Sequence, residues 1–279
     1  MISLVSVLGL LIFASSCGPG VDIGPTQELS IDEPLGSAAV TDVEIEMGAG
    51  TLSVSPGATG LASGVIRYNV DAWTPTVDRN DKKLTIAQGK KSGLETTGSD
   101  IVNDWRLQLG NAPMRLQVSA GAYNGTYELG GLILQGLTIT DGAAKSEVRF
   151  GSANPGQMER LLYETGASAV NLTDLANANF KTFEFNGGAG SYTMDFSGQL
   201  RTDGTVRIKV GAGTVRIVVP AETAARVTVK GSLTDVSLEG DWTNTGKTSA
   251  TPAAKADSQG KSLLIEVDMS VGTLELVAR

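Results

Sequence analysis

One short motif recurs along this chain of 279 residues: an alternating run of apolar and polar residues, a corner with glycine, and a second alternating run. Residues 206–220, VRIKVGAGTVRIVVP, show it in full, and residues 43–56, VEIEMGAGTLSVSP, repeat it. In every copy the sixth residue after the first corner residue is apolar and the fifth is polar. The first corner residues are Gly48, Gly110, Gly121, Gly142, Gly166, Gly188 and Gly211, with Ser270 in the last copy. From Gly121 onward the corners are 21, 24, 22 and 23 residues apart, which indicates a structural repeat.

The period of this repeat predicts an all-β fold. Strict alternation is typical of a strand with one buried face, and glycine lets the chain bend where side chains would clash. A unit of about 22 residues with glycine corners predicts a β-solenoid whose rungs stack about 4.8 Å apart. An aromatic content of only 5% suits columns of stacked aliphatic residues. In residues 206–220 we expect the core to contain Val206, Ile208, Val215, Ile217 and Val219, and water to surround Arg207, Lys209 and Arg216.

The spacing of the first corners suggests a smaller element. Gly110 and Gly121 stand only 11 residues apart. We therefore expect MRLQV, residues 114–118, to be both the strand that leaves one corner and the strand that enters the next.

Composition changes along the chain predict four segments. Residues 1–16 are expected to form a signal peptide, and residues 17–38, rich in Gly, Pro and acids, a flexible tether. Residues 39–98 are expected to form an N-terminal cap with the first rungs, in which DRNDKK is the tip of a hairpin. Residues 99–279 are expected to form the solenoid, with a polar excursion at 241–262 that helps to cap its far end before residues 263–278 return as the last strands.

The apolar run from Leu4 to Ala14 is too short to cross a bilayer and matches the apolar region of a signal peptide. Small residues at 14–16 lead directly into Cys17, the single cysteine of the chain. This arrangement resembles a bacterial lipobox, which implies cleavage before Cys17 and lipid attachment to it. We therefore expect an extracytoplasmic protein held to the bacterial cell membrane by an N-terminal lipid.

Composition also excludes several classes of function. The net charge of −8 argues against nucleic acid as a partner, because nucleic acid selects basic surfaces. The chain has no histidine and one cysteine, so we expect neither a metal site nor a cofactor. The Gly-Ala-Gly corners lack the third glycine and the following helix of a dinucleotide-binding loop, which favours a structural role.

Three other sets of residues have both a functional and a structural interpretation. Paired acids could make a polysaccharide-active enzyme, and the outward candidates are Asp141, Glu147, Glu164, Asp174 and Asp195. The acids do not recur in one column, however, which favours solvated polar faces. Trp73, Trp105 and Trp242 could stack on sugars, but core or capping roles are expected. The pairs Lys82-Lys83 and Lys90-Lys91 are expected to be hairpin and loop charges rather than a site for an acidic partner.

Residues 39–279 resemble a known family. The glycine corners, DWRLQLGNAP with Trp105, MDFSG and VGAGTVRIVVP are similar to the bacterial toast-rack family, which includes the C-terminal region of LiaF-type cell-wall-antibiotic-response proteins and is related to adhesin-type domains. The resemblance implies a single-chain right-handed β-helix in the cell envelope, without catalytic residues. LiaF-type proteins carry membrane helices before this region, whereas this chain does not show them.

These observations lead to an expected function with two alternatives. We expect a non-enzymatic, lipid-anchored β-solenoid that acts as an adhesin-like binding protein or scaffold, with an envelope glycan or a membrane protein as its partner. The first alternative is a sensory or regulatory component of the envelope stress response. The second is an envelope polysaccharide-active enzyme.

Overall fold

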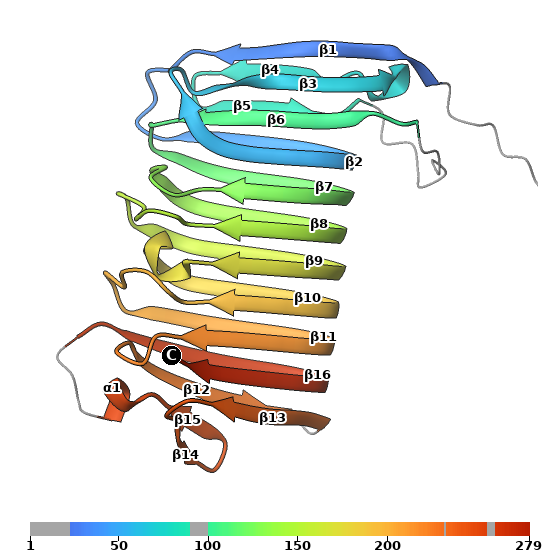
Figure 1. Cartoon of the computed structure of the whole chain (residues 1–279). Helices are drawn as coiled ribbons and strands as arrows, with labels where there is room; N and C mark the ends of the chain where they lie inside the picture. Colours follow the sequence, from blue (N-terminus) through green and yellow to red (C-terminus); the bar gives the residue numbers. More distant parts are fainter. Residues whose placement is uncertain (1–22, 90–99, 232, 256–259) are drawn as a thin grey trace, which may run out of the picture.

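The computed structural model describes residues 23–89, 100–231, 233–255 and 260–279, so the expected signal peptide and Cys17 lie outside the described residues. Sixteen strands form one sheet that is stacked into a tall solenoid (Figure 1). The order along the stack is β1-β3-β6-β2-β7-β8-β9-β10-β11-β16-β12-β15-β14, with β4, β5 and β13 joined at its sides. The all-β solenoid predicted from the repeat is confirmed.

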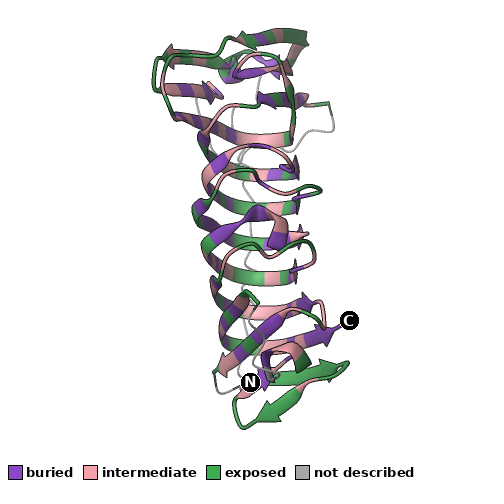
Figure 2. Ribbon diagram, turned by 90° about the vertical axis from the view of Figure 1, so that its left-hand side faces the viewer, coloured by how far each residue is buried: buried purple, intermediate pink, exposed green. Residues whose placement is uncertain are grey.

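Each central rung is one long strand that bends at its corner (Figures 1 and 2). These strands are β2 (Thr41–Ala58), β7 (Met114–Glu128), β8 (Leu134–Arg149), β9 (Met158–Thr173), β10 (Phe180–Asp195), β11 (Gly204–Val219) and β16 (Ser262–Ala278). We call the part before the corner the first arm and the part after it the second arm. Neighbouring rungs pair in parallel on both arms, and the residue offsets from β7 to β11 match the 21, 24, 22 and 23 residues between the corners.

The inward residues form one continuous core. In β11 the side chains of Val206, Ile208, Val215, Ile217 and Val219 are all buried and those of Arg207 and Lys209 are exposed, as predicted. Arg216, which was also expected in water, is half-buried. The column six residues after the corner is buried in every central rung and contains Val54, Tyr127, Val148, Leu172, Met194, Ile217 and Leu276. Figure 2 shows the resulting alternation of buried and exposed positions along each rung.

The corner glycines serve close stacking, as expected. A Cβ atom on Gly166 would lie 2.4 Å from the carbonyl oxygen of Gly142, and one on Gly188 would lie 2.4 Å from that of Gly166. The third corner residue is constrained further, because Gly213 has a φ of +130°, which favours glycine.

The interpretation of Gly110 as a corner is wrong. Gly110 ends strand β6 (Asn103–Gly110), and β7 begins after a turn at Met114. MRLQV is therefore only the first arm of β7. A Cβ atom on Gly110 would lie 1.8 Å from the carbonyl oxygen of Gly60, so glycine is required here for a close approach at the end of an arm.

The N-terminal end of the stack is a split rung covered by antiparallel strands. Strand β5 (Lys83–Ala87) pairs with the first arm of β2, and β6 pairs with its second arm. Strand β4 (Thr76–Asn80) covers β5 as the predicted hairpin, while β3 (Ala62–Val70) covers β6 and leads into a short helix, η1 (Asp71–Trp73). Strand β1 (Ile23–Glu33) covers β3. Residues 23–33 are thus a paired strand rather than part of a flexible tether, because their backbone completes the sheet above β3.

The C-terminal end is also a split rung. Strands β12 (Ala224–Lys230) and β13 (Leu233–Glu239) pair with the first and second arms of β16. The predicted excursion holds the hairpin β14 (Thr243–Thr245) and β15 (Thr248–Ala250) and the short helix α1 (Pro252–Lys255). Strand β16 is last in the chain but not in the stack, because it lies between β11 and the split rung.

Candidate binding surfaces

The five acids considered for catalysis lie on different parts of the solenoid. Glu147 is exposed on the second arm of β8, and Glu164 on the first arm of β9 accepts a hydrogen bond from Asn186 at 3.2 Å. Asp174 and Asp195 lie where second arms end, and Asp141 is inside the core. These five residues therefore do not form the facing carboxylate pair that glycoside hydrolysis requires.

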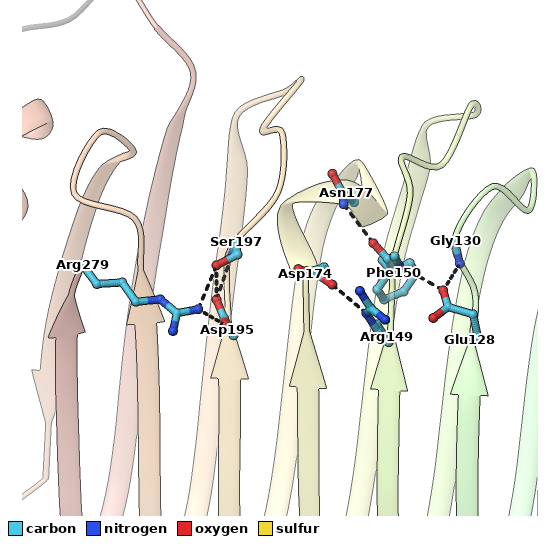
Figure 3. Close-up of polar contacts among 10 residues, drawn as sticks. Glu128, Gly130, Arg149, Phe150, Asp174, Asn177, Asp195, Ser197 and Arg279 are labelled. Carbon is cyan, nitrogen blue, oxygen red and sulfur yellow. Dashed lines mark hydrogen bonds and ion pairs between the residues drawn. The ribbon is translucent and has the colours of Figure 1, made fainter.

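The acids at the ends of the second arms hold the rung-end loops (Figure 3). Glu128 accepts backbone N–H bonds from Gly130 and Gly151, both at 3.0 Å, and so ties two successive loops together. Arg149 donates to Asp174 at 3.0 Å. Arg279, which follows β16, donates to Asp195 at the end of β10 at 2.6 Å. These carboxylates therefore stabilise the loops and the contacts between rungs.

The expectation that Asp141 faces water is wrong, because Asp141 is only 6% exposed. Its carboxylate accepts hydrogen bonds from the hydroxyls of Tyr163 at 2.7 Å, Thr165, and Ser168 at 3.3 Å. Asp141 directly precedes the corner Gly142, at the same position as the buried Val210 in β11. The alternation therefore turns this acid inward, where the neighbouring rung β9 supplies three hydroxyl donors.

Tyrosines complete this buried polar cluster. The hydroxyls of Tyr123 and Tyr127 lie 2.9 Å apart. Burial is the main cause that raises the pKa of Tyr123 to about 12, and it raises the pKa values of Tyr127 and Tyr163 as well. The tyrosines consequently stay neutral at ordinary pH, and the cluster is part of the core.

The tryptophans also have structural roles. Trp73 and Trp105 are buried, and the Trp105 indole donates to the side-chain oxygen of Asn103 at 2.8 Å. Trp242 is half-buried against the core and donates to the backbone oxygen of Glu239 at 3.1 Å. Lys83 pairs with Glu44 at 2.8 Å on the surface, and Lys90-Lys91 lie outside the described residues.

A shallow groove of about 490 Å³ crosses the outer face of the second arms at the N-terminal end, and Val65 and Leu107 line it together with polar and charged residues. It spans β1, β3, β6 and β2, where Gly64, Ser53 and Ser55 leave room for it. Arg67 and Arg106 line the groove, and each has an acidic partner: Arg67 pairs with Glu28 at 2.9 Å and Arg106 with Asp104 at 2.8 Å. Sequence reasoning missed this groove, because β1 was taken for tether and antiparallel strands bring its walls together.

This groove offers hydrogen-bond donors and acceptors. Arg106 and Gln108 project from β6, and the serine hydroxyls of β2 stand beside them in register. Guanidinium and amide groups of this kind suit an extended polar ligand that carries hydroxyl or carboxylate groups. Across the described ranges, no group of three or more Cys, Asp or Glu side chains is arranged to hold a metal ion. Within the same residues no helix is long and apolar enough to cross a membrane.

Comparison with known proteins agrees with this architecture. A protein from Clostridium sporogenes described as a candidate cell adhesion protein has a similar structure, with a TM-score of 0.51 at 16% identity, and the match covers 91% of this chain and all of the other. A candidate adhesin from Parabacteroides distasonis matches with a TM-score of 0.40 at 12% identity over 91% of this chain and 97% of the other. Among curated proteins, no significant match is found.

The family comparison is specific to the N-terminal half. Residues 22–160 match the family described as the N-terminal domain of toast_rack, a span that includes β1 to β8 and all residues of the groove. The repeated bent rungs continue from this span to β16 with the same corner and the same core columns. The chain therefore belongs to the toast-rack family.

Proposed function

We propose that this protein is a lipid-anchored, extracytoplasmic toast-rack protein that binds an envelope partner as an adhesin or scaffold, without catalysing a reaction. The observation that carries the proposal is the groove over β1, β3, β6 and β2, whose two arginines are each paired with an acid and whose lining lacks a facing pair of acids. Such a surface suits binding of a polar polymer such as an envelope glycan.

The proposed anchor would attach close to this groove. Ile23, the first residue of β1, comes six positions after Cys17, and six steps of extended chain span at most about 20 Å. A lipid on Cys17 would therefore hold the N-terminal end of the stack near the membrane surface. The stack itself is roughly 50 Å tall, from ten steps between β1 and β13 at about 4.8 Å each. The opposite end would be free to reach outward when the solenoid stands upright.

The anchor is tested in bacterial cells that express the chain with and without Cys17→Ser. A clickable fatty acid should label the wild-type chain and bring it into the membrane fraction. The variant should lose both the label and the membrane partition. Unchanged membrane partition of Cys17→Ser would contradict the lipid anchor. The binding role is tested separately on the glycan array.

Binding is tested with purified chain on an array of envelope glycans. Arg106→Ala should weaken the captured signal about tenfold or more, because loss of a charged hydrogen-bond donor costs about 1.5–3 kcal/mol. Arg207→Ala is the matched control, since Arg207 is similarly exposed but lies on the first arm of β11. Equal effects of the two variants would argue against the groove. A membrane protein that co-purifies in place of a glycan would favour the regulatory alternative.

A further inference from the structure

The end rung at the C-terminal end is covered on only one of its two arms. On the first arm, β12 pairs with β16 on one side and with β15 on the other. On the second arm, β13 pairs with β16, and no other strand in the described part of the chain pairs with its outer edge. At the opposite end, by contrast, β3 and β1 cover the second arm and β4 covers the first. The outer edge of β13 thus offers backbone donors and acceptors for a further strand.

Two core columns are left open at this edge. Val236 and Leu238 stand in register with Leu274 and Leu276 of β16 and face the interior as those residues do. Leu274 and Leu276 are fully buried, whereas Val236 is 39% exposed and Leu238 is 40% exposed. A strand with apolar residues at the matching positions would extend both columns by one layer.

The outward residues of β13 determine which charges a strand added at its outer edge should carry. Asp235, Ser237 and Glu239 alternate with the two apolar residues and are exposed. Glu239 shares Arg216 with Glu275, at 3.6 Å against 2.7 Å, so its own ion pair is the weaker one. Elsewhere in the solenoid an acidic residue on one rung faces basic residues on the next, as Lys230 of β12 pairs with Glu266 of β16 at 2.8 Å. The complementary strand would therefore carry Lys or Arg opposite Asp235 and Glu239.

A second copy of this chain does not supply that pattern at its open edges. Antiparallel pairing of β13 with itself would bring its own acids together. Stacking of β13 on β1 would set Asp235 and Glu239 against an outward face that carries Glu28 and Asp32. Like charges directly opposite each other destabilise paired strands. The acids at both ends thus oppose growth of the solenoid into a fibre.

We propose that the outer edge of β13 is a docking site for an extended segment of a partner protein in which apolar residues alternate with Lys or Arg. The segment adds one strand to the second arm, buries Val236 and Leu238, and pairs its basic side chains with Asp235 and Glu239. This inference goes beyond the proposed function, because it depends on the end rung and not on the lipid or the groove.

The test uses the full chain and two short dye-labelled peptides, one in which valine alternates with lysine and one in which valine alternates with glutamate. Fluorescence anisotropy at low salt should show the lysine peptide binding at least about tenfold more tightly. Leu238→Lys should weaken this binding about tenfold or more, because it places a like charge in the open column. Leu264→Lys is the matched control, since Leu264 is also exposed but lies on the first arm of β16.

A second variant separates the charge rule from simple stickiness. The double reversal Asp235→Lys with Glu239→Lys should transfer the preference to the glutamate peptide, and the circular dichroism spectrum should stay unchanged. Equal binding of both peptides by the wild-type chain, or equal loss in Leu238→Lys and Leu264→Lys, would overturn the proposal. A wild-type dimer that Leu238→Lys converts to monomer would overturn it too, because the occupant would then be a second copy.

Discussion

At the scale of single residues, the corner of each rung is determined by the backbone of the rung before it. A Cβ atom on Gly213 would lie 1.9 Å from the carbonyl oxygen of Gly190 and 2.9 Å from its carbon, and the φ of +130° is unfavourable for an L side chain. Gly213→Ala should therefore lower the free energy of unfolding by about 2–4 kcal/mol, as the sum of backbone strain and overpacking. Urea titration followed by circular dichroism measures this loss.

Gly136→Ala provides the control for that substitution. The nearest atom to its new Cβ would be Cγ of Arg115 at 3.5 Å, an ordinary contact. We expect its free energy of unfolding to change by less than about 1 kcal/mol. If both variants lose the same stability, the general flexibility of glycine and not the stacking of corners would be responsible.

For single residues, the direction of a side chain could be predicted from the sequence in the strands but not at every corner. Ile217 and Leu276 could be assigned to the core because alternation on either side of a corner sets the direction of each side chain. Asp141 was misassigned because residue type suggested water, whereas its position before the corner points inward to the hydroxyls of Tyr163 and Thr165. Gly110 was misassigned because a sequence spacing cannot distinguish a bend within a strand from a turn between strands.

At the scale of elements, charges on the outer faces favour the correct stacking of rungs. Glu184 of β10 pairs with Arg160 of β9 at 2.6 Å and approaches Arg207 of β11 at 4.0 Å. Glu184→Lys would set like charges on three successive rungs and should lower the free energy of unfolding by about 1–2 kcal/mol, since each exposed pair contributes roughly 0.2–1 kcal/mol. Denaturant titrations at low and at high salt measure the effect, which should shrink at high salt because the charges are screened.

A charge swap controls for changes in packing at Glu184. Combining Glu184→Lys with Arg160→Glu restores an opposite-charge pair between β9 and β10 and should recover most of the lost stability. Failure to recover would mean that the shape of the glutamate side chain, and not its charge, matters at this position.

Strand order, unlike the alternation within a strand, could not be predicted from the sequence. Strand β16 lies between β11 and β12, although the segment from β12 to β15 precedes it in the chain. Strand β1 escaped prediction because Gly24 and Pro25 interrupt its alternation.

At the scale of the whole molecule, the two ends of the solenoid differ in ways that suit different tasks. At the N-terminal end β1 and β4 cover both arms of the split rung, and this end carries the groove and lies next to the proposed anchor. The C-terminal end leaves the edge of β13 open, with two apolar columns and two acids exposed there. If both proposals hold, the molecule would act as a spacer with one binding surface near the membrane and another at its far end.

Two leucines in one column test this difference between the interior and the open end. Leu276 of β16 is fully buried, and Leu238 of β13 stands beside it in register but is 40% exposed. Leu276→Ala leaves a cavity between rungs and should lower the free energy of unfolding by about 2–5 kcal/mol. Leu238→Ala removes a side chain that lacks a described layer beneath it and should cost about 1 kcal/mol or less. Urea titrations of the two variants measure these losses. If Leu238→Ala costs as much as Leu276→Ala, the edge of β13 is covered in solution and cannot receive a partner strand without first being uncovered.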